Sequence, residues 1–197
     1  MKFIVCSLTG CVCAAMLCFA VPGTAAEMKK CACQTVTPAS YTWDFSAEAN
    51  MIFRAIQSEA KQALDQADQF NAYADDDNPD WQIQGEQLNT IKTEINDMGA
   101  KLCRLSTIRR VVKPWQQREI DRIKGDVLLM ADNAQDAIAF GNLHQDNLCF
   151  LPYRNYANNL YFDTRDLTQS VDKAVEYVNL SKEYRDLRHR LGVRAAS

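Results

Sequence analysis

Residues 79–105 read PDWQIQGEQLNTIKTEINDMGAKLCRL, and this stretch carries the clearest packing signal in the chain. Apolar residues recur in it at alternating steps of three and four, which places them on one face of a helix. These residues are Leu88, Ile91, Ile95, Met98, Leu102 and Leu105. A heptad seam of this kind is typical of helices that pack lengthwise against other helices. We predict a helix that has Asn78 as its N-cap, starts at Pro79 and runs to about Leu105.

The preceding residues predict another amphipathic helix, over 46–74. Its apolar face is also spaced by three and four, and it is rich in small side chains that let a partner helix approach closely. The face consists of Phe45, Ala49, Ile52, Ile56, Ala60, Ala63, Ala67, Phe70 and Ala74. Three consecutive aspartates, at 75–77, separate this helix from the next one.

Two further helices are predicted toward the carboxyl end. Pro114 begins the third helix, which runs to about Gly141, and a connection rich in asparagine and aromatic residues follows over 142–162. Asp163 or Thr164 caps the fourth helix. The third helix carries the apolar face Ile120, Ile123, Val127, Met130, Ala134 and Ala137, and the fourth carries Leu167, Val171, Ala174 and Val178. This last stripe continues with a shifted phase through Leu180, Tyr184, Leu187 and Leu191.

The chain therefore predicts an all-α fold, an up-down-up-down antiparallel four-helix bundle over 46–197. Only seven glycines and five prolines occur in 197 residues, which favours long uninterrupted helices over a fold with many turns. A single domain is typical of this length. Residues 27–45 lack helical periodicity, and we predict that they form an extended leader before the bundle.

The first 26 residues have the pattern of a secretion signal. Lys2 precedes an uncharged, largely apolar run over 3–21, and the small residues at 24–26 suit cleavage before Glu27. The sequence therefore predicts export to the periplasm or cell envelope. Two alternatives stay open: the apolar run remains uncleaved as an anchor, or the lipobox-like stretch at 8–11 directs a lipid anchor.

Four cysteines lie outside the predicted signal: Cys31, Cys33, Cys103 and Cys149. In an oxidising compartment they are candidates for disulfides rather than for metal thiolates. The predicted topology puts Cys103 at the same end of the bundle as the leader, so a bridge from Cys31 or Cys33 to Cys103 is favoured. Cys149 falls at the opposite end, and it meets a leader cysteine only if the leader runs the length of the bundle.

The sequence contains no pattern for catalysis or cofactor binding. It lacks the serine-hydrolase elbow, the glycine-rich phosphate loop, Cys-x-x-Cys-His and Glu-x-x-His, so we predict no enzyme, no cofactor and no metal centre. Met51 and His189 would lie at one end of the bundle, as haem ligands do in helical cytochromes. Each is two positions away from its apolar stripe, however, and is predicted to face away from the core. The acidic loop at 75–80 lacks the spacing of an EF-hand.

Charged residues gather at the two ends of the predicted bundle. The end that contains the 106–113 connection is the basic pole, and its interaction candidates are Arg104, Arg109, Arg110, Lys113, Arg185, Arg188 and Arg190. The other end is the acidic pole, with Asp65, Asp68, Asp75, Asp76, Asp77, Asp80, Asp146, Asp163 and Asp166. Complementing the helix dipoles accounts for this layout, and docking on an anionic membrane surface or an acidic protein is the functional alternative. Export and a pI near 5.4 argue against nucleic acid.

The predicted connection at 142–162 concentrates aromatic residues. We predict that they form a lid over the open end of the bundle, with Phe150, Tyr153, Tyr156 and Tyr161 as candidates. A lid of this kind can cover an apolar ligand pocket.

Four short stretches carry a resemblance to a known family. They are NDMG at 96–99, PWQQ at 114–117, IDRI at 120–123 and YRNY at 153–156. Through them, most of the chain after the signal resembles a family of secreted bacterial four-helix proteins of unknown function. The resemblance implies export and a helical fold, and it implies no activity and no site residues.

These features predict an exported helical binding or interaction module without catalytic activity. Two alternatives stay open. One is a carrier of a small ligand or metal that uses the aromatic lid or the acidic loop, and the other is an envelope enzyme whose site follows no known motif. The sequence specifies neither the oligomeric state nor the identity of the partner.

Overall fold

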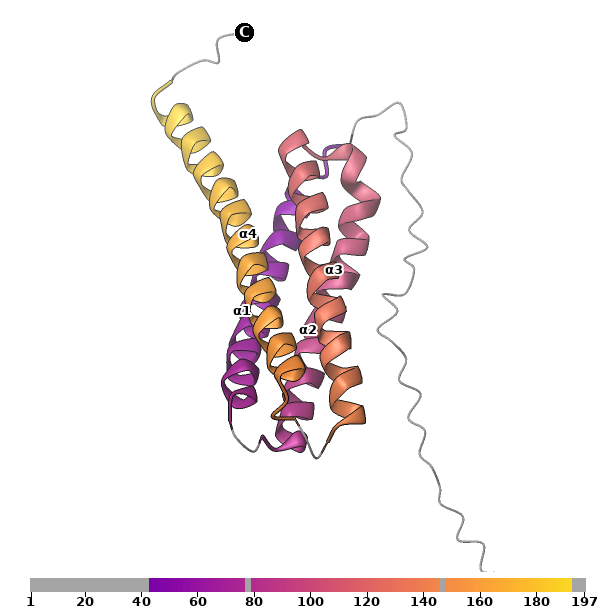
Figure 1. Ribbon diagram of the computed structural model, residues 1–197. Helices are drawn as coiled ribbons and strands as arrows, with labels where there is room; N and C mark the ends of the chain where they lie inside the picture. Colours follow the sequence, from indigo (N-terminus) through magenta and orange to yellow (C-terminus); the bar gives the residue numbers. More distant parts are fainter. Residues whose placement is uncertain (1–42, 77–78, 146–147, 193–197) are drawn as a thin grey trace, which may run out of the picture.

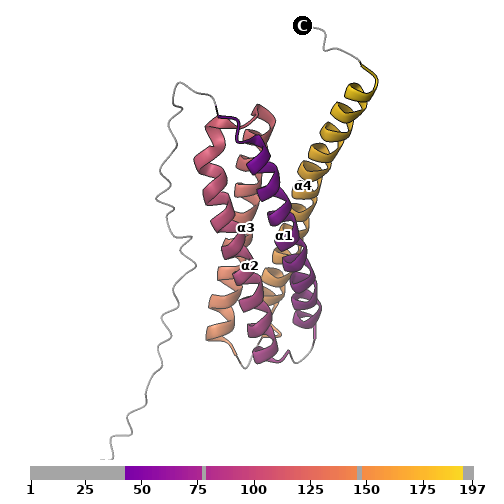
Figure 2. The same ribbon diagram turned by 180° about the vertical axis from the view of Figure 1, so that it is seen from behind.

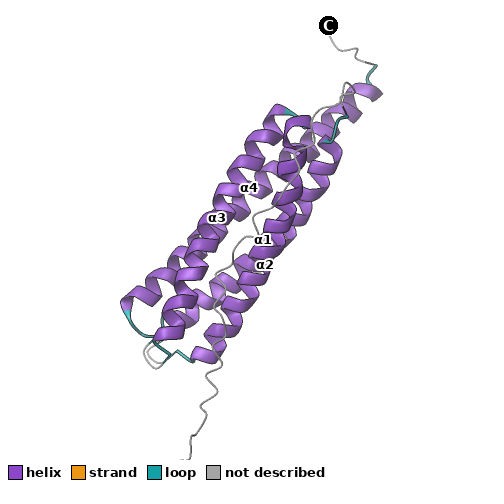
Figure 3. Cartoon of the chain, turned by 90° about the vertical axis from the view of Figure 1, so that its right-hand side faces the viewer, coloured by secondary structure: helices purple, strands orange, loops and turns teal. Residues whose placement is uncertain are grey.

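The computed structural model describes residues 43–76, 79–145 and 148–192, which form four long helices packed side by side into a rod (Figure 1). The helices are α1 (Ser46–Ala74), α2 (Trp81–Ile108), α3 (Pro114–Leu143) and α4 (Leu151–Arg190), with a short 3₁₀ turn, η1 (Arg109–Val111), after α2. No strand occurs in the described part of the chain (Figure 3). The predicted all-α four-helix bundle is confirmed. The predicted signal and nearly all of the predicted leader lie outside the described residues.

Each helix packs between two neighbours around a shared interior. α1 contacts α2 and α4, and α3 contacts the same two helices, so the chain runs up and down around the core. The starts of α1 and α3 and the ends of α2 and α4 therefore lie at the same end of the rod, the basic pole (Figures 1 and 2). The turns from α1 to α2 and from α3 to α4 lie at the acidic pole.

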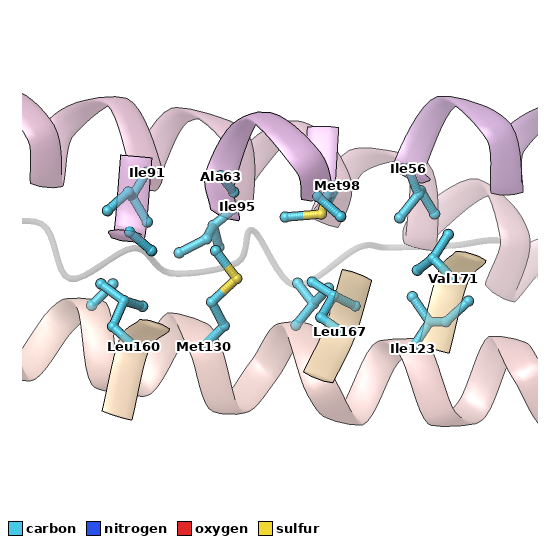
Figure 4. Packing of buried hydrophobic residues seen from close by; sticks show 14 of the residues in the cluster. Ile56, Ala63, Ile91, Ile95, Met98, Ile123, Met130, Leu160, Leu167 and Val171 are labelled. Atoms are coloured by element: carbon cyan, nitrogen blue, oxygen red, sulfur yellow. The ribbon is translucent and has the colours of Figure 1, made fainter. Parts of the chain in front are cut away.

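Apolar side chains from all four helices fill the core, which burial stabilises. The predicted seam of α2 is buried along its whole length, from Leu88 to Leu105. Side chains of α1 and α2 point toward those of α3 and α4 in Figure 4, among them Ile56, Ala63, Ile95, Met98, Ile123, Met130, Leu160 and Leu167.

The buried face of α1 differs from the prediction at one position. Ala49, Phe53 and Ile56 are fully buried, whereas Ile52 is only partly buried against the core. Between Ala49 and Ile56, a core position at residue 52 gives steps of three and four, and one at residue 53 gives steps of four and three. Both patterns fit a helix, so periodicity alone does not choose between Ile52 and Phe53. The Phe53 ring lies 6.2 Å from the ring of Trp115 in the first turn of α3, and this contact between helices favours the larger side chain inside.

α2 starts two residues later than predicted. Asp80 is its N-cap, and the Asp80 carboxylate accepts a hydrogen bond from the Gln82 backbone N–H at 2.7 Å. Pro79 therefore precedes the cap instead of opening the helix, and Asn78 lies outside the described residues. An aspartate at the cap satisfies a free N–H and places negative charge at the positive end of the helix dipole. α3 begins at Pro114, as predicted.

The largest difference from the prediction is the length of α4. This helix spans 40 residues, and residues 151–162 belong to it instead of forming a connection. Pro152 stands in the first turn, where no backbone donor is needed. Tyr153, Ala157 and Leu160 recur at steps of four and three and are buried. Their packing outweighs the weak helix propensity of the asparagines between them.

The end of α4 lies outside the shared core. Val178 is its last buried residue, and residues 179–192 are exposed or half-buried. Toward this end the helix leans away from the other three (Figures 1 and 2). It stops before Gly192, whose φ of +64° is the left-handed conformation that commonly ends helices. About three turns of α4 therefore project from the basic pole.

Candidate interaction sites

A buried glutamine fixes the shape of the basic pole. Gln116, in the first turn of α3, is fully buried, and its amide donates to the Ser46 backbone carbonyl at 2.9 Å and to the Asn50 side-chain oxygen at 2.8 Å. The Gln116 side-chain oxygen accepts a hydrogen bond from the Lys113 backbone N–H at 3.0 Å. Breaking these bonds would leave buried polar groups unpaired. They therefore hold the start of α1 firmly against the turn between α2 and α3.

Two of the predicted basic-pole arginines form ion pairs with neighbouring elements on the surface of the bundle. Arg104 donates through two guanidinium nitrogens to Glu48 of α1, at 2.6 and 3.1 Å. Arg109 donates in the same forked way to Asp121 of α3, with its Nε 2.7 Å from the carboxylate. The hydrogen bonds from Arg109 hold the pKa of the Asp121 carboxyl below its ordinary value. Both arginines thus connect neighbouring helices and offer little charge to a partner.

Other cations of the basic pole remain open to solvent. Arg110 and Lys113 are exposed on the turn between α2 and α3, and neither forms an ion pair within the described part of the chain. The segment 104–122 contains six basic and two acidic residues, so two internal pairs leave it strongly positive. Exposed positive charges attract anionic surfaces over about a Debye length.

The end of α4 adds a second group of cations. Arg185 donates through Nε to the Ser181 backbone carbonyl one turn back, at 3.2 Å. The Arg188 guanidinium lies over the Tyr184 ring, 5.9 Å from its centroid, and Arg190 is exposed. Residues 181–191 hold four basic and two acidic side chains. The topology therefore brings the α4 cations to the same pole as those of the turn between α2 and α3, as the sequence predicts.

The projecting end of α4 also exposes a row of large apolar side chains. Tyr177, Leu180, Tyr184, Leu187 and Leu191 form this row, which we call the α4 seam, and their exposed fractions are 51%, 56%, 62%, 54% and 66%. The seam starts where the Tyr177 ring meets the Trp115 ring of α3 at 4.7 Å. The sequence shows a shift in phase at Leu180, but it predicts that Leu180, Tyr184, Leu187 and Leu191 continue the core stripe. That shift is the signal that the row leaves the core.

Three candidates for the aromatic lid, Tyr153, Tyr156 and Tyr161, lie on the first turns of α4, and Phe150 is its N-cap. The prediction of a loop over 151–162 is therefore wrong. Tyr153 is a core residue, only 1% exposed, with its ring 5.7 Å from Phe70 and 5.8 Å from Phe140. Its hydroxyl donates to the Gln84 side-chain oxygen at 3.2 Å. Burial raises the pKa of the Tyr153 phenol above its ordinary value, so the hydroxyl keeps its proton.

The other three lid candidates lie at different depths along α4. Phe150, just before the helix, is 49% exposed. Tyr156 is partly buried, with its ring 6.1 Å from Phe140. Tyr161 lies farther along the helix and contacts the Phe162 ring at 5.5 Å. The four side chains therefore do not gather over one opening.

A small pocket opens near the acidic pole between the start of α2, the end of α3 and the start of α4. Its volume is about 180 Å³, and its lining includes Trp81, Leu88, Ile138, Leu148 and Tyr153. Of the four lid candidates, Tyr153 alone lines it. Most small-molecule sites enclose roughly 300–1,000 Å³, so this pocket has room only for a very small ligand.

The described cysteines lie at opposite poles. Cys103 is half-buried near the end of α2, at the basic pole, and Cys149 is exposed and free before α4, at the acidic pole. Cys31 and Cys33 lie outside the described residues. The bridge from a leader cysteine to Cys103 therefore stays a prediction.

Acidic residues are more spread out than predicted. Asp75, Asp76 and Asp80 lie in the turn between α1 and α2, at the acidic pole. Asp163 and Asp166 lie in the middle part of α4, because this helix begins well before them. Asp163 faces α3 there and accepts a hydrogen bond from the Asn133 side-chain amide.

Metal and haem sites receive no support from the geometry. The described residues contain no group of three histidine, cysteine or acidic side chains that could hold a metal ion. Met51, which is 63% exposed, and His189 both lie on the outside of the bundle. The predicted outward orientation of these two side chains is confirmed.

The half-buried carboxyl of Asp163 yields a pH-dependent prediction. Burial raises its pKa above the ordinary value, and the nearby Asp166 and Asp126 add to this, whereas the hydrogen bond from Asn133 opposes it. A raised pKa in the folded state means that the ionised form destabilises the fold at neutral pH and that stability recovers as the pH falls through that pKa. Asp163→Asn keeps an acceptor for Asn133. It is therefore expected to raise Tm at neutral pH, with the gain shrinking in acid.

Thermal melts in steps from neutral to acidic pH check this expectation. Asp132→Asn is the matched control, because Asp132 is an exposed aspartate of the same helix as Asn133. This control is expected to leave Tm unchanged. A Tm gain for Asp163→Asn that stays constant across the pH range would contradict the burial argument.

Comparison of the chain with protein-family models, with curated proteins and with solved structures found no match. The resemblance to secreted bacterial four-helix proteins therefore stays a prediction. Among the described helices, none is both long enough and apolar enough to span a membrane.

Proposed function

We propose that this protein is an exported helical interaction module that docks its basic pole on an anionic membrane surface. The observation that carries the proposal is the set of exposed cations at one end of the rod. Arg110 and Lys113 come from the turn between α2 and α3, and Arg185 and Arg190 come from the end of α4. Each cation close to an anionic bilayer contributes about 1 kcal/mol of attraction.

The distribution of charge along the rod also supports end-on docking. Arg104 and Arg109 are already paired with carboxylates of the bundle, so the attraction rests mainly on the exposed side chains of Arg110, Lys113, Arg185 and Arg190. At the far end, Asp75, Asp76 and Asp80 would be repelled by an anionic surface. A rod with opposite charges at its two ends therefore prefers one orientation at such a surface.

Export belongs to the same proposal. It is supported by the positive start, the apolar run at 3–21 and the small residues at 24–26. An intact mass of the exported chain that corresponds to a start at Glu27 tests this step. A bridge between Cys103 and Cys31 or Cys33 would fit the oxidising compartment.

Sedimentation of the exported chain with vesicles tests the docking. Vesicles that contain anionic phospholipid are expected to bind the chain at low salt, and binding is expected to disappear at high salt because the charges are screened. The double substitution Arg110→Gln/Lys113→Gln removes two cations, which is worth about 2 kcal/mol, and is expected to weaken binding about 30-fold.

Lys124→Gln/Lys173→Gln is the matched control. Both lysines are exposed, and they lie along the rod away from its basic end, so removing them changes the net charge equally. This control is expected to weaken binding by less than about threefold. Equal losses for the two double variants would show that net charge, and not the basic pole, drives the attraction. An absence of vesicle binding would overturn the proposal and favour an acidic protein as the partner.

A further inference from the structure

The α4 seam has the spacing of a surface that packs against another helix. Its five members follow one another at steps of three, four, three and four, which is the heptad pattern of a coiled coil. Only about one residue per turn is apolar, and charged residues flank the row on both sides. A helix that lies in a membrane surface has a wider apolar face than this. The narrow seam therefore fits a single partner helix better than it fits lipid.

We propose that the α4 seam pairs with the same seam of a second copy of this chain, with the two helices antiparallel. The orientation follows from the place where the seam begins. Tyr177 packs against Trp115 at the start of α3. In a parallel pair, the part of the partner's α4 that precedes residue 177 would extend beyond the contact between Tyr177 and Trp115. It would meet α3 there. An antiparallel partner ends its helix near this point instead.

Charge selects one register among those that the heptad spacing allows. When Tyr184 faces Leu187 of the partner subunit, the flanking Glu183 faces Arg190 of the partner subunit, and symmetry repeats this pair. Sliding the helices by one heptad places Glu183 opposite Glu183 of the partner subunit. Sliding them the other way places Arg190 opposite Arg190 of the partner subunit. The first slide also pairs Arg190 with Glu176 of the partner subunit, but only the register with Tyr184 opposite Leu187 of the partner subunit brings no like charges together at the flanking positions.

The size of the contact predicts a weak and reversible dimer. Five side chains per copy are roughly half exposed, and covering them would bury on the order of 1,000 Å² in total. This value is at the lower limit for specific interfaces, so dissociation in the micromolar range is expected. The pairing depends mainly on apolar side chains and the docking on exposed cations. Arg190 takes part in both, so the paired form offers fewer cations to a membrane. Leu187→Asp tests the pairing and Arg110→Gln/Lys113→Gln tests the docking, so failure of one proposal is distinguishable from failure of the other.

Sedimentation velocity of the exported chain over a wide concentration range tests the pairing. A monomer–dimer equilibrium in the micromolar range is expected, and Leu187→Asp is expected to weaken it about 100-fold or more, because it buries two unpaired charges. Leu129→Asp is the matched control. Leu129, on α3, is 54% exposed like Leu187 but lies outside the seam. It is expected to leave the dimer unchanged.

Charge exchange then tests orientation and register. Glu183→Arg alone and Arg190→Glu alone are each expected to weaken the dimer, because each places like charges opposite one another. The double variant Glu183→Arg/Arg190→Glu restores opposite charges and is expected to recover it. If Arg188→Glu rescues Glu183→Arg instead, the helices are parallel and the proposed arrangement is wrong.

Two further outcomes would overturn the pairing. One is a chain that stays monomeric at every concentration, or a dimer that Leu187→Asp leaves intact. The other is a chain that stays monomeric and binds vesicles, with binding lost in Leu187→Asp and kept in Leu129→Asp. This result would mean that the α4 seam contacts lipid and not a second copy. Helical circular dichroism of each variant confirms that exposed substitutions have not unfolded the bundle.

Discussion

Phe53→Ala is expected to destabilise the folded chain by about 3–5 kcal/mol, because it empties a fully buried site between α1 and α3. The Trp115 ring loses its neighbour, and surrounding side chains close the cavity only partly. For a chain of this length the loss corresponds to a Tm lowered by roughly 10 °C. Chemical or thermal unfolding followed by circular dichroism measures it.

Ile52→Ala is the informative comparison for this substitution. Ile52 is the residue that sequence periodicity assigns to the core, but in the fold it is only partly buried. Its replacement is expected to cost about 1 kcal/mol. If Ile52→Ala proved the more damaging of the two, α1 would be rotated relative to its neighbours. The periodicity would then have been the better guide.

Tyr153→Ala is expected to cost about 4 kcal/mol or more. The substitution removes a ring that packs on Phe70 and Phe140, and it also leaves the buried oxygen of Gln84 without its donor. Because the Gln84 amide nitrogen has no hydrogen-bond partner among the described residues, its side chain would lose its last one there. Equilibrium unfolding in denaturant measures the loss.

Two companion variants separate the contributions at this site. Tyr153→Phe keeps the ring and removes only the hydrogen bond, so a loss of about 1–2 kcal/mol is expected. Phe150→Ala changes an exposed aromatic residue just before the helix and is expected to cost less than about 1 kcal/mol. Similar effects of Phe150→Ala and Tyr153→Ala would mean that both rings belong to a surface lid, as the sequence pattern suggested.

The architecture was predictable because long helices repeat the same signal many times. The α2 seam contains six apolar residues in regular heptad steps, and all six are buried. Individual positions were less certain wherever two spacings fit, as at Ile52 and Phe53. The choice there depends on Trp115, which arrives from a helix more than 60 residues along the chain. Local periodicity contains no information about that contact.

The start of α4 shows how tertiary packing overrides local preference. Pro152 and several asparagines suggested a loop, since these residues are poor helix formers. Burial of Tyr153, Ala157 and Leu160 on one face supplies the stabilisation that propensity lacks. The misplaced boundary also misplaced Asp163, which the sequence assigned to the acidic pole and the fold places along the middle of the rod.

The position of the basic pole could be predicted from the sequence. Which of its cations are paired with carboxylates, and which remain for a partner, could not. Topology alone brings the ends of α2 and α4 to the start of α3, so the position follows from helix order. The pairs of Arg104 with Glu48 and Arg109 with Asp121 depend on how far neighbouring helices are shifted along each other. That shift is set by core packing, and no sequence pattern reports it directly.

The two parts of α4 differ in how much they pack against other helices, and this difference determines where the molecule unfolds locally. Up to Val178 the helix is flanked by α1 and α3, whereas beyond it the backbone hydrogen bonds have little shelter. Isolated helices of about 12 residues are marginal in water, so this end can unravel and reform while the rest stays intact. Among the described residues of the unpaired chain, a protease specific for basic residues would therefore cut first at Lys182, Arg185, Arg188 or Arg190.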